Sequence, residues 1–124
     1  MAILGIGVDV VELARVRGLC VRRPEAFAQR VFTESEQALF TPEPDIARIA
    51  ARFAVKEAVS KALGTGIGKI AWKDIETTNA PGGAPVVTLY GAAADLAHAR
   101  GVRQVHCSIS HERSVAMAMI ILEG

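Results

Sequence analysis

The sequence predicts an α+β fold in which an antiparallel sheet packs on one long helix, with short helices around them. The segment 46–63 contains no glycine or proline, and it lies between Asp45 and Gly64. A polar N-cap and a glycine stop of this kind indicate a long helix. Strand-like runs flank a turn at 79–83, and residues 104–110 alternate apolar and polar side chains. The order of these elements is not the regular βαβ alternation of a parallel sheet.

The first half of the chain is expected to contain one strand and then several helices. The apolar run at its start predicts a short, largely buried strand. In the segment 11–19, Glu12 lies near the start and two arginines lie later, a charge order that suits the dipole of a helix. Pro24 is typical of the first residue of a further helix. Thr33 and Glu36 form a capping box. The expected elements are a strand at 3–10, helices at 11–19 and 24–30, and a short helix ending at Phe40.

The second half is expected to be rich in strands. Asn79 to Gly83 predicts the turn of a hairpin, and Gly101 predicts the end of a helix. In the run from Gln104, one face carries Val105, Cys107 and Ile109. The expected elements are strands at 74–78 and 85–90, a helix at 91–100, and strands at 104–110 and 114–122 joined by a turn at 111–113.

Length, composition and charge limit the possible functions. The 124 residues, of 13.1 kDa, predict one domain, 1–124. Aromatic residues are only 5% and alanine supplies much of the apolar share, so the core is thin and an oligomer is expected. A net charge of +1 argues against a general nucleic-acid binder. No secretory signal or membrane-spanning run is evident, so we expect free thiols at Cys20 and Cys107, a cytoplasmic location and no membrane partner.

Glu57 is an unusual residue in the predicted long helix, because it falls on the apolar face. A buried carboxylate without a partner costs several kcal/mol or becomes protonated. Lys61, one helical turn later, can supply a structural ion pair, and a metal or a hydrogen-bond network are the alternatives. The apolar face consists of Ile46, Ile49, Ala50 and Phe53.

Asp9 presents a similar question, because it ends an apolar strand. It could be the N-cap of the following helix. It could also converge with Glu57 on one point, and two carboxylates with room for water and phosphate oxygens suit magnesium. Arg48, Arg52 and Lys56 lie at intervals of four residues and form a basic edge beside Glu57. The simpler interpretation of that edge is an exposed, solvated face.

The glycine-rich segment 64–69 is similar to a phosphate-binding loop, but it does not match the Walker A motif. Leu63 stands where that motif needs glycine, and Ile70 stands where it needs serine or threonine. The glycines also follow a helix and do not precede one. We therefore expect a glycine C-cap followed by a turn.

Taken together, the motifs resemble those of holo-acyl-carrier-protein synthases, the small class of 4′-phosphopantetheinyl transferases. The resemblance covers nearly the whole chain in the expected order. Its most specific part is the block around Lys56 and Glu57. The matching segments are GIGVDVVE at 5–12, FTESE at 32–36, RFAVKEAVSKALGTG at 52–66, GAP at 83–85 with Val87, Leu89 and Gly91, and SISH at 108–111.

This resemblance implies a 4′-phosphopantetheinyl transferase-like fold and a specific reaction. Members of this class move 4′-phosphopantetheine from coenzyme A to a serine of apo acyl carrier protein and release adenosine 3′,5′-bisphosphate. The implied role is in fatty acid biosynthesis. The class forms homotrimers with sites at subunit interfaces, and the expected partners are coenzyme A and an acidic carrier protein.

The resemblance also assigns roles to individual residues. Asp9 and Glu57 would hold Mg²⁺, Lys61 would neutralise pyrophosphate oxygens, and Glu57 is the candidate base for the serine proton. These three are the expected catalytic residues. The remaining residues implied in coenzyme A binding are Arg52, Lys56, Gly64, Thr65, Gly66, Pro85 and His111.

Residues 14–30 are rich in arginine, with Glu25 as the only acid, and we expect them to dock the acidic carrier. The predicted docking residues are Arg15, Arg17, Arg22 and Arg23. An ordinary solvated helix is the alternative. Two other functions stay open for the chain: another magnesium-dependent phosphoryl transferase or phosphodiesterase that uses Asp9 and Glu57, or a non-catalytic oligomeric module that binds coenzyme A or a nucleotide.

Overall fold

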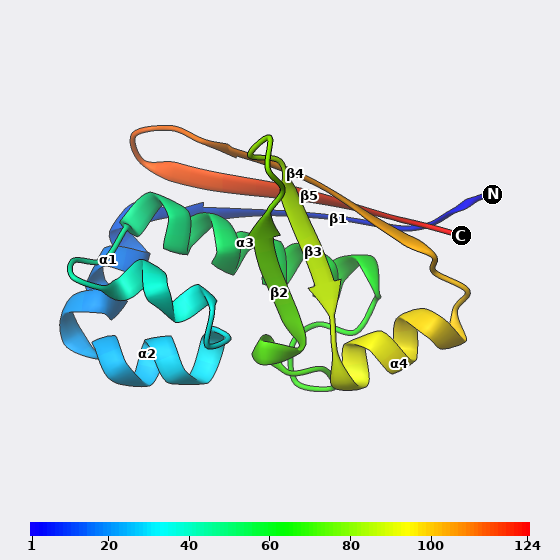
Figure 1. The fold of residues 1–124 in the computed structure, drawn as a ribbon, viewed down its shortest axis with the longest axis horizontal. Coiled ribbons are helices and arrows are strands. Elements are labelled where there is room, and N and C mark those ends of the chain that lie inside the picture. The colour runs from blue at the N-terminus through cyan, green and yellow to red at the C-terminus, as the bar shows by residue number, and fades with distance from the viewer.

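The computed structural model describes residues 1–124 and has the predicted α+β architecture (Figure 1). A three-stranded antiparallel sheet in the order β1-β5-β4 lies over the long helix, and a separate hairpin crosses the helix beside it. The two chain ends lie together at one end of the sheet (Figure 1). The elements are β1 (Ile3–Glu12), α1 (Leu13–Arg22), α2 (Pro24–Val31), the 3₁₀ helix η1 (Glu36–Phe40), α3 (Ile46–Ala62), the 3₁₀ helix η2 (Trp72–Asp74), β2 (Ile75–Asn79), β3 (Pro85–Leu89), α4 (Gly91–Ala99), β4 (Gln104–His111) and β5 (Val115–Glu123).

The long helix α3 forms the centre of the molecule, as predicted. Asp45 caps it by accepting a hydrogen bond from the amide of Arg48 at 3.3 Å. The helix ends at Ala62, and Gly64 follows with φ of +76°, a left-handed conformation that favours glycine. Most of its residues are buried, so α3 contributes the largest share of the hydrophobic core.

One face of β1 lies close against α3 because it carries glycines. A Cβ atom on Gly7 would overlap the carbonyl oxygen of Ala58, and one on Gly5 would overlap that of Ala62. Asp9 follows on the same face and pairs with Ala118 of β5. The alternation of side chains along a strand therefore brings the Asp9 carboxylate to the α3 side of the sheet.

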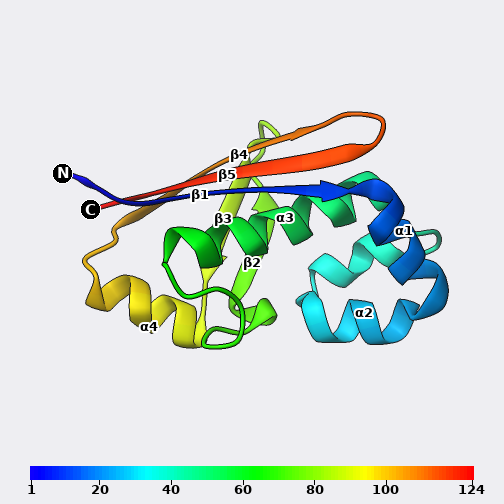
Figure 2. The ribbon, with the colours of Figure 1, turned by 180° about the vertical axis from the view of Figure 1, so that it is seen from behind.

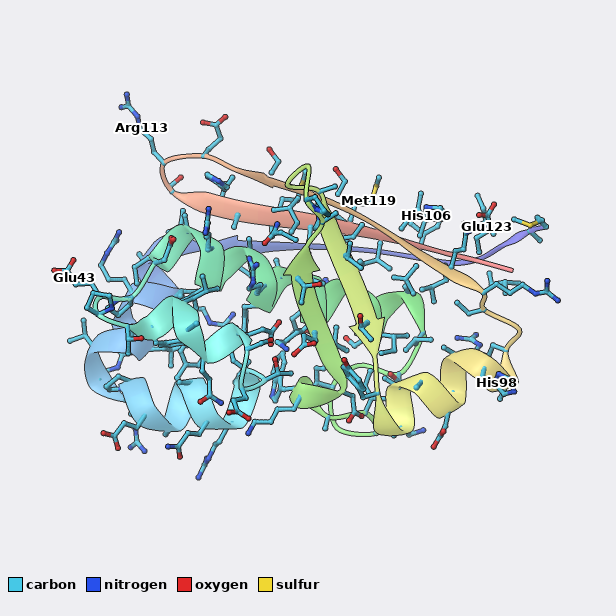
Figure 3. All side chains as sticks on the ribbon, viewed as in Figure 1. Glu43, His98, His106, Arg113, Met119 and Glu123 are labelled. Atoms are coloured by element: carbon cyan, nitrogen blue, oxygen red, sulfur yellow. The ribbon has the colours of Figure 1, made fainter.

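The opposite face of the same sheet is apolar and exposed. Ile6 is 61% exposed, Val8 48%, and Val10 58%, and Met117 and Met119 of β5 are also exposed. No helix covers these residues, and Figure 3 shows Met119 projecting from the side of the sheet that is away from the helices. The prediction of a largely buried first strand is therefore wrong for the isolated chain. We call these five residues the outer sheet face.

The helices before α3 form a small lobe with aromatic packing. The rings of Phe27 and Phe32 meet edge to face, with centroids 5.2 Å apart. The predicted capping box is present, because Glu36 accepts from the Thr33 amide at 3.0 Å and the Glu36 amide donates to the Thr33 hydroxyl at 3.4 Å. The first helix begins at Leu13, two residues later than predicted, because β1 continues pairing with β5 as far as Glu12.

The second half follows the predicted order closely. β2 and β3 form the expected antiparallel hairpin, with Asn79 opposite Pro85. α4 follows and ends before Gly101, whose φ of +80° marks the predicted stop. The alternation in β4 also matches, since Val105, Cys107 and Ile109 lie on its less exposed face. Both cysteines are free, and none of the helices is long and apolar enough to cross a membrane.

Candidate functional site

Asp9, Glu57 and Lys61 come together where the end of β1 lies against the last two turns of α3. The Nζ atom of Lys61 is 3.0 Å from Oδ1 of Asp9 and also donates to the carbonyl of Val8 at 3.0 Å. The Asp9 side chain is only 16% exposed. The structure thus joins residues that are 48 positions or more apart in the sequence, because both elements meet at the close contact made by the β1 glycines.

Glu57 is half-buried, and its carboxylate has no hydrogen-bond or ion-pair partner. The ion pair with Lys61, one of the alternatives for Glu57, is not formed, because Lys61 binds Asp9. Burial raises the pKa of Glu57, the negative charge of Asp9 raises it further, and Lys61 and Arg15 act in the opposite direction. A carboxylate kept close to a second carboxylate in this way is poised to share a cation or to take up a proton.

Arg15, part of the arginine-rich segment 14–30, lies near Asp9, Glu57 and Lys61. It lies in the first turns of α1, is exposed, and places its guanidinium carbon 5.6 Å from the ring centroid of Phe53. Phe53 in turn stacks on Trp72, with centroids 5.0 Å apart. Arg15 is also one of the charges that lower the pKa of Glu57. One residue predicted for docking therefore stands beside the predicted catalytic group.

The structure places Lys56 in the core, not at the surface where a phosphate contact was predicted. Its side chain is fully buried, and its ammonium donates to Glu36 at 2.7 Å, to the carbonyl of Trp72 at 3.1 Å and to that of Ile75. All three protons are used inside the core, so a direct contact with a coenzyme A phosphate does not fit this geometry. The expected solvated edge is also wrong at this position, since only Arg48 of the three is well exposed, at 66%.

Three of the other predicted binding residues, Arg52, Pro85 and His111, lie apart from Asp9 and Glu57. Arg52 is 8% exposed and donates to the side chain of Asn79 at 2.8 Å, beside Pro85 on the hairpin. Residue 52 lies about 140° around the helix from Glu57. His111 is exposed at the end of β4, two strands away from β1. Within one chain, the predicted site is thus divided into two groups.

The segment 64–66 forms the predicted glycine cap directly after Lys61 and Leu63. The amides of Thr65 and Gly66 donate to the carbonyl of Ser60, and that of Gly64 donates to Lys61. These three amides are therefore not free to bind a phosphate. The Thr65 hydroxyl oxygen is buried without a partner. What this segment can contribute to a ligand site is a backbone without bulky side chains, which a ligand can approach closely.

Sequence reasoning missed Glu36 and Asn79, the side chains that bind Lys56 and Arg52. Glu36 is buried, and besides Lys56 it accepts from the amide of Thr77 at 2.9 Å. The capping box was a correct signal for Glu36, but it indicated only the local bond to Thr33. Nothing in the local pattern pairs Glu36 with a lysine twenty residues later.

Comparison with known proteins gives the family. The model of the 4′-phosphopantetheinyl transferase superfamily matches residues 5–118. The chain belongs to this superfamily. A relative named holo-[acyl-carrier-protein] synthase, from Natranaerobius thermophilus, is 46% identical over 121 residues and covers 97% of each chain. The match places the chain among the holo-acyl-carrier-protein synthases of this superfamily and confirms the resemblance inferred from the motifs.

Solved structures confirm the fold. The holo-acyl-carrier-protein synthase of Neisseria meningitidis has a TM-score of 0.89 and 33% identity, covering 99% of this chain and 100% of that one. The Helicobacter pylori enzyme, solved in complex with coenzyme A, has a TM-score of 0.82 and 35% identity, covering 95% and 99%. The phosphopantetheinyl transferase fold predicted from the motifs is therefore correct over the full length.

Proposed function

We propose that this chain is a holo-acyl-carrier-protein synthase. It transfers 4′-phosphopantetheine from coenzyme A to a serine of apo acyl carrier protein, releases adenosine 3′,5′-bisphosphate, and thereby supports fatty acid biosynthesis. The observation that carries the proposal is the convergence of Asp9, Glu57 and Lys61 at one point of a fold that matches holo-acyl-carrier-protein synthases from end to end. Free thiols at both cysteines are compatible with the reducing cytoplasm, which we propose as its location.

Asp9 and Glu57 fit a magnesium ion. Their donor set is two carboxylates, without a third histidine, cysteine or acidic side chain nearby. Magnesium is usually held by one or two protein carboxylates and keeps other positions for water and phosphate oxygens. When bound, the ion would neutralise charge on the pyrophosphate of coenzyme A.

The chain's own residues supply the rest of the chemistry. The side chain of Lys61 is 53% exposed, and its ammonium can donate to an oxygen of the leaving phosphate, where negative charge develops as the bond breaks. Glu57 accepts the proton of the attacking serine hydroxyl, a role favoured because burial raises its pKa above the ordinary value. Asp9 orients Lys61 through their 3.0 Å contact.

We further propose that three copies of the chain assemble through the outer sheet face. Its apolar side chains are exposed in one chain, and such a patch is typical of a subunit interface. A neighbouring copy would also supply the second group of binding residues, Arg52, Pro85 and His111, which one chain does not place beside Asp9. The sites would then lie at the subunit interfaces.

Substitution of Val8 by aspartate tests this assembly. Val8→Asp places a charge in the outer sheet face, so we expect monomers by light scattering and loss of activity. Val21, which is 76% exposed on α1, provides the matched control. Val21→Asp should keep the assembly of the unmodified chain. Trimers that persist in Val8→Asp contradict the proposed interface.

Acyl carrier protein is proposed to dock on the arginines of α1 and its end. Arg15, Arg17, Arg22 and Arg23 are all exposed. Arg15 and Arg22 are seven residues apart and share one face of the helix, the one that leads to Glu57. The variant with Arg15→Glu and Arg22→Glu should bind the carrier more weakly and lose most of the salt dependence of binding. Unchanged affinity and salt dependence contradict this docking surface.

The transfer itself is tested by mass spectrometry of the carrier. Incubation with coenzyme A, Mg²⁺ and a competent apo carrier should add one 4′-phosphopantetheine group. Glu57→Gln and Asp9→Asn should each lose most of the turnover. Glu12→Gln, an exposed carboxylate on the same strand as Asp9, should keep it. No mass gain with the unmodified chain contradicts the proposed function, and full turnover in both site variants contradicts the assigned roles.

A further inference from the structure

Arg100, which follows the last residue of α4, binds the carbonyl end of α3. Its Nη1 atom donates a hydrogen bond to the carbonyl oxygen of Leu63, the residue that caps α3. Leu63 is 2% exposed, and no backbone amide donates to this carbonyl. The last carbonyls of a helix lack partners within the helix, and a cation at this end is favoured by the helix dipole. Arg100 therefore supplies the hydrogen-bond donor that the Leu63 carbonyl does not receive from the backbone.

The guanidinium of Arg100 also lies beside the glycine segment. A Cβ atom on Gly64 would be 3.9 Å from Nη1 of Arg100, the nearest atom to that position. Gly64 and Gly66 both have left-handed backbones, with φ of +76° and +67°. The position of the segment thus depends on the backbone bonds to Ser60 and Lys61 and on the side chain of Arg100.

Few other contacts could replace this bond. α4 buries Ala93 and Ala97, and its only larger apolar side chain against the core is Leu96, which is partly buried. Two residues before Leu63, Lys61 reaches Asp9 across the end of β1. Because Asp9 and the Val8 carbonyl hold Lys61, a shift of the chain beyond it would move the glycine segment while Lys61 stays in place.

We infer that Arg100 is a positioning residue for coenzyme A, which acts by holding the carbonyl end of α3 and the segment 64–66 in the geometry that binds the nucleotide. This inference rests on the proposed function, because it assumes that the segment lies against coenzyme A. Arg100 acts through Leu63 and the segment, and its planar, always charged guanidinium suits a fixed carbonyl acceptor.

The test compares Arg100→Leu and Arg100→Lys with the unmodified chain. Loss of one hydrogen bond that holds the segment should raise the KM and Kd for coenzyme A about threefold to tenfold. Because the reacting groups are untouched, kcat and the KM for the carrier should stay within about twofold. Arg100→Lys keeps a charged donor and should restore most of the affinity. Hydrogen exchange should become faster in a peptide that covers residues 60–68.

Arg103→Leu is the matched control, because Arg103 is an exposed arginine just beyond α4 whose side chain makes no hydrogen bond. It should leave all of these quantities unchanged. Unchanged coenzyme A affinity in Arg100→Leu overturns the inference, and so does a loss of kcat and of both affinities together without rescue by lysine. Turnover by the unmodified chain tests the proposed function separately, and calorimetric binding of coenzyme A measures the role of Arg100 without turnover.

Discussion

Replacing Lys56 with methionine should strongly destabilise the fold. Methionine has nearly the same length and keeps the apolar stem of the side chain, so the change removes mainly the ammonium. The carboxylate of Glu36, 2.7 Å away and fully buried, then loses its counter-charge, and the carbonyls of Trp72 and Ile75 lose a donor. Burial lowers the pKa of Lys56, while Glu36 opposes that effect. The ion pair is therefore held in a region that water does not reach.

The size of the effect follows from this burial. Removing one partner of a buried ion pair costs about 3–5 kcal/mol, because the other charge is left unpaired. For a chain of this length, the melting temperature should fall by about 10–20 °C. The free energy of unfolding is measured by urea titration at one fixed protein concentration, because an oligomer's stability depends on concentration.

Two further variants make the test of Lys56 specific. Arg48→Met changes an exposed cation of the same helix edge, at 66% exposure, and should change stability by less than about 0.5 kcal/mol. Adding Glu36→Leu to Lys56→Met removes the unpaired carboxylate and should recover part of the loss. A loss below about 1 kcal/mol in Lys56→Met alone would refute the argument that the ammonium is needed in the core.

Three smaller predictions concern other positions. Gly7→Ala places a Cβ atom on the carbonyl of Ala58, so it should lower the free energy of unfolding by at least about 2 kcal/mol, measured by urea titration. Thr77→Val removes a buried hydroxyl without a partner and should raise the melting temperature; a lower value contradicts this. Hydrogen bonding from the Thr33 hydroxyl lowers the pKa of Glu76 below its ordinary 4.5. The folded state then binds fewer protons than the unfolded state, so this stability is present above about pH 4.5 and is lost as the pH falls further. Thr33→Val should therefore be more destabilising at pH 7 than at pH 3, and an equal loss at both contradicts the assignment.

Local patterns were sufficient where the cause of the structure is local. The start of α3 was predictable because Asp45 and the amide of Arg48 are three residues apart. Its end was predictable because the left-handed backbone that follows a helix favours glycine, here Gly64. Glu57 could be singled out because a carboxylate on an apolar helix face is anomalous whatever surrounds it. These signals depend only on neighbours within one or two helical turns.

Two features could not be predicted because their causes lie elsewhere in the fold. Lys56 has the spacing of an exposed helix edge, and it is buried only because Glu36 and the carbonyls before β2 come to meet it. The apolar residues of β1 form the same sequence pattern whether the strand packs in the core of one chain or against another subunit. Its exposure on one face, at Val8 and Val10, becomes visible only when the sheet is in place.

Figure 2 shows β1 running along α3, and the glycines on this side of β1 also exclude a wrong pairing of the sheet. A slip of β1 by one residue against β5 would turn every side chain to the opposite face. Ile6 would then have to enter the space in which even a methyl group at Gly7 collides with Ala58. The same slip would carry Asp9 to the apolar outer face, away from Lys61. The same close contact with α3 therefore fixes both the register of β1 and the side of the sheet on which the Asp9 carboxylate lies.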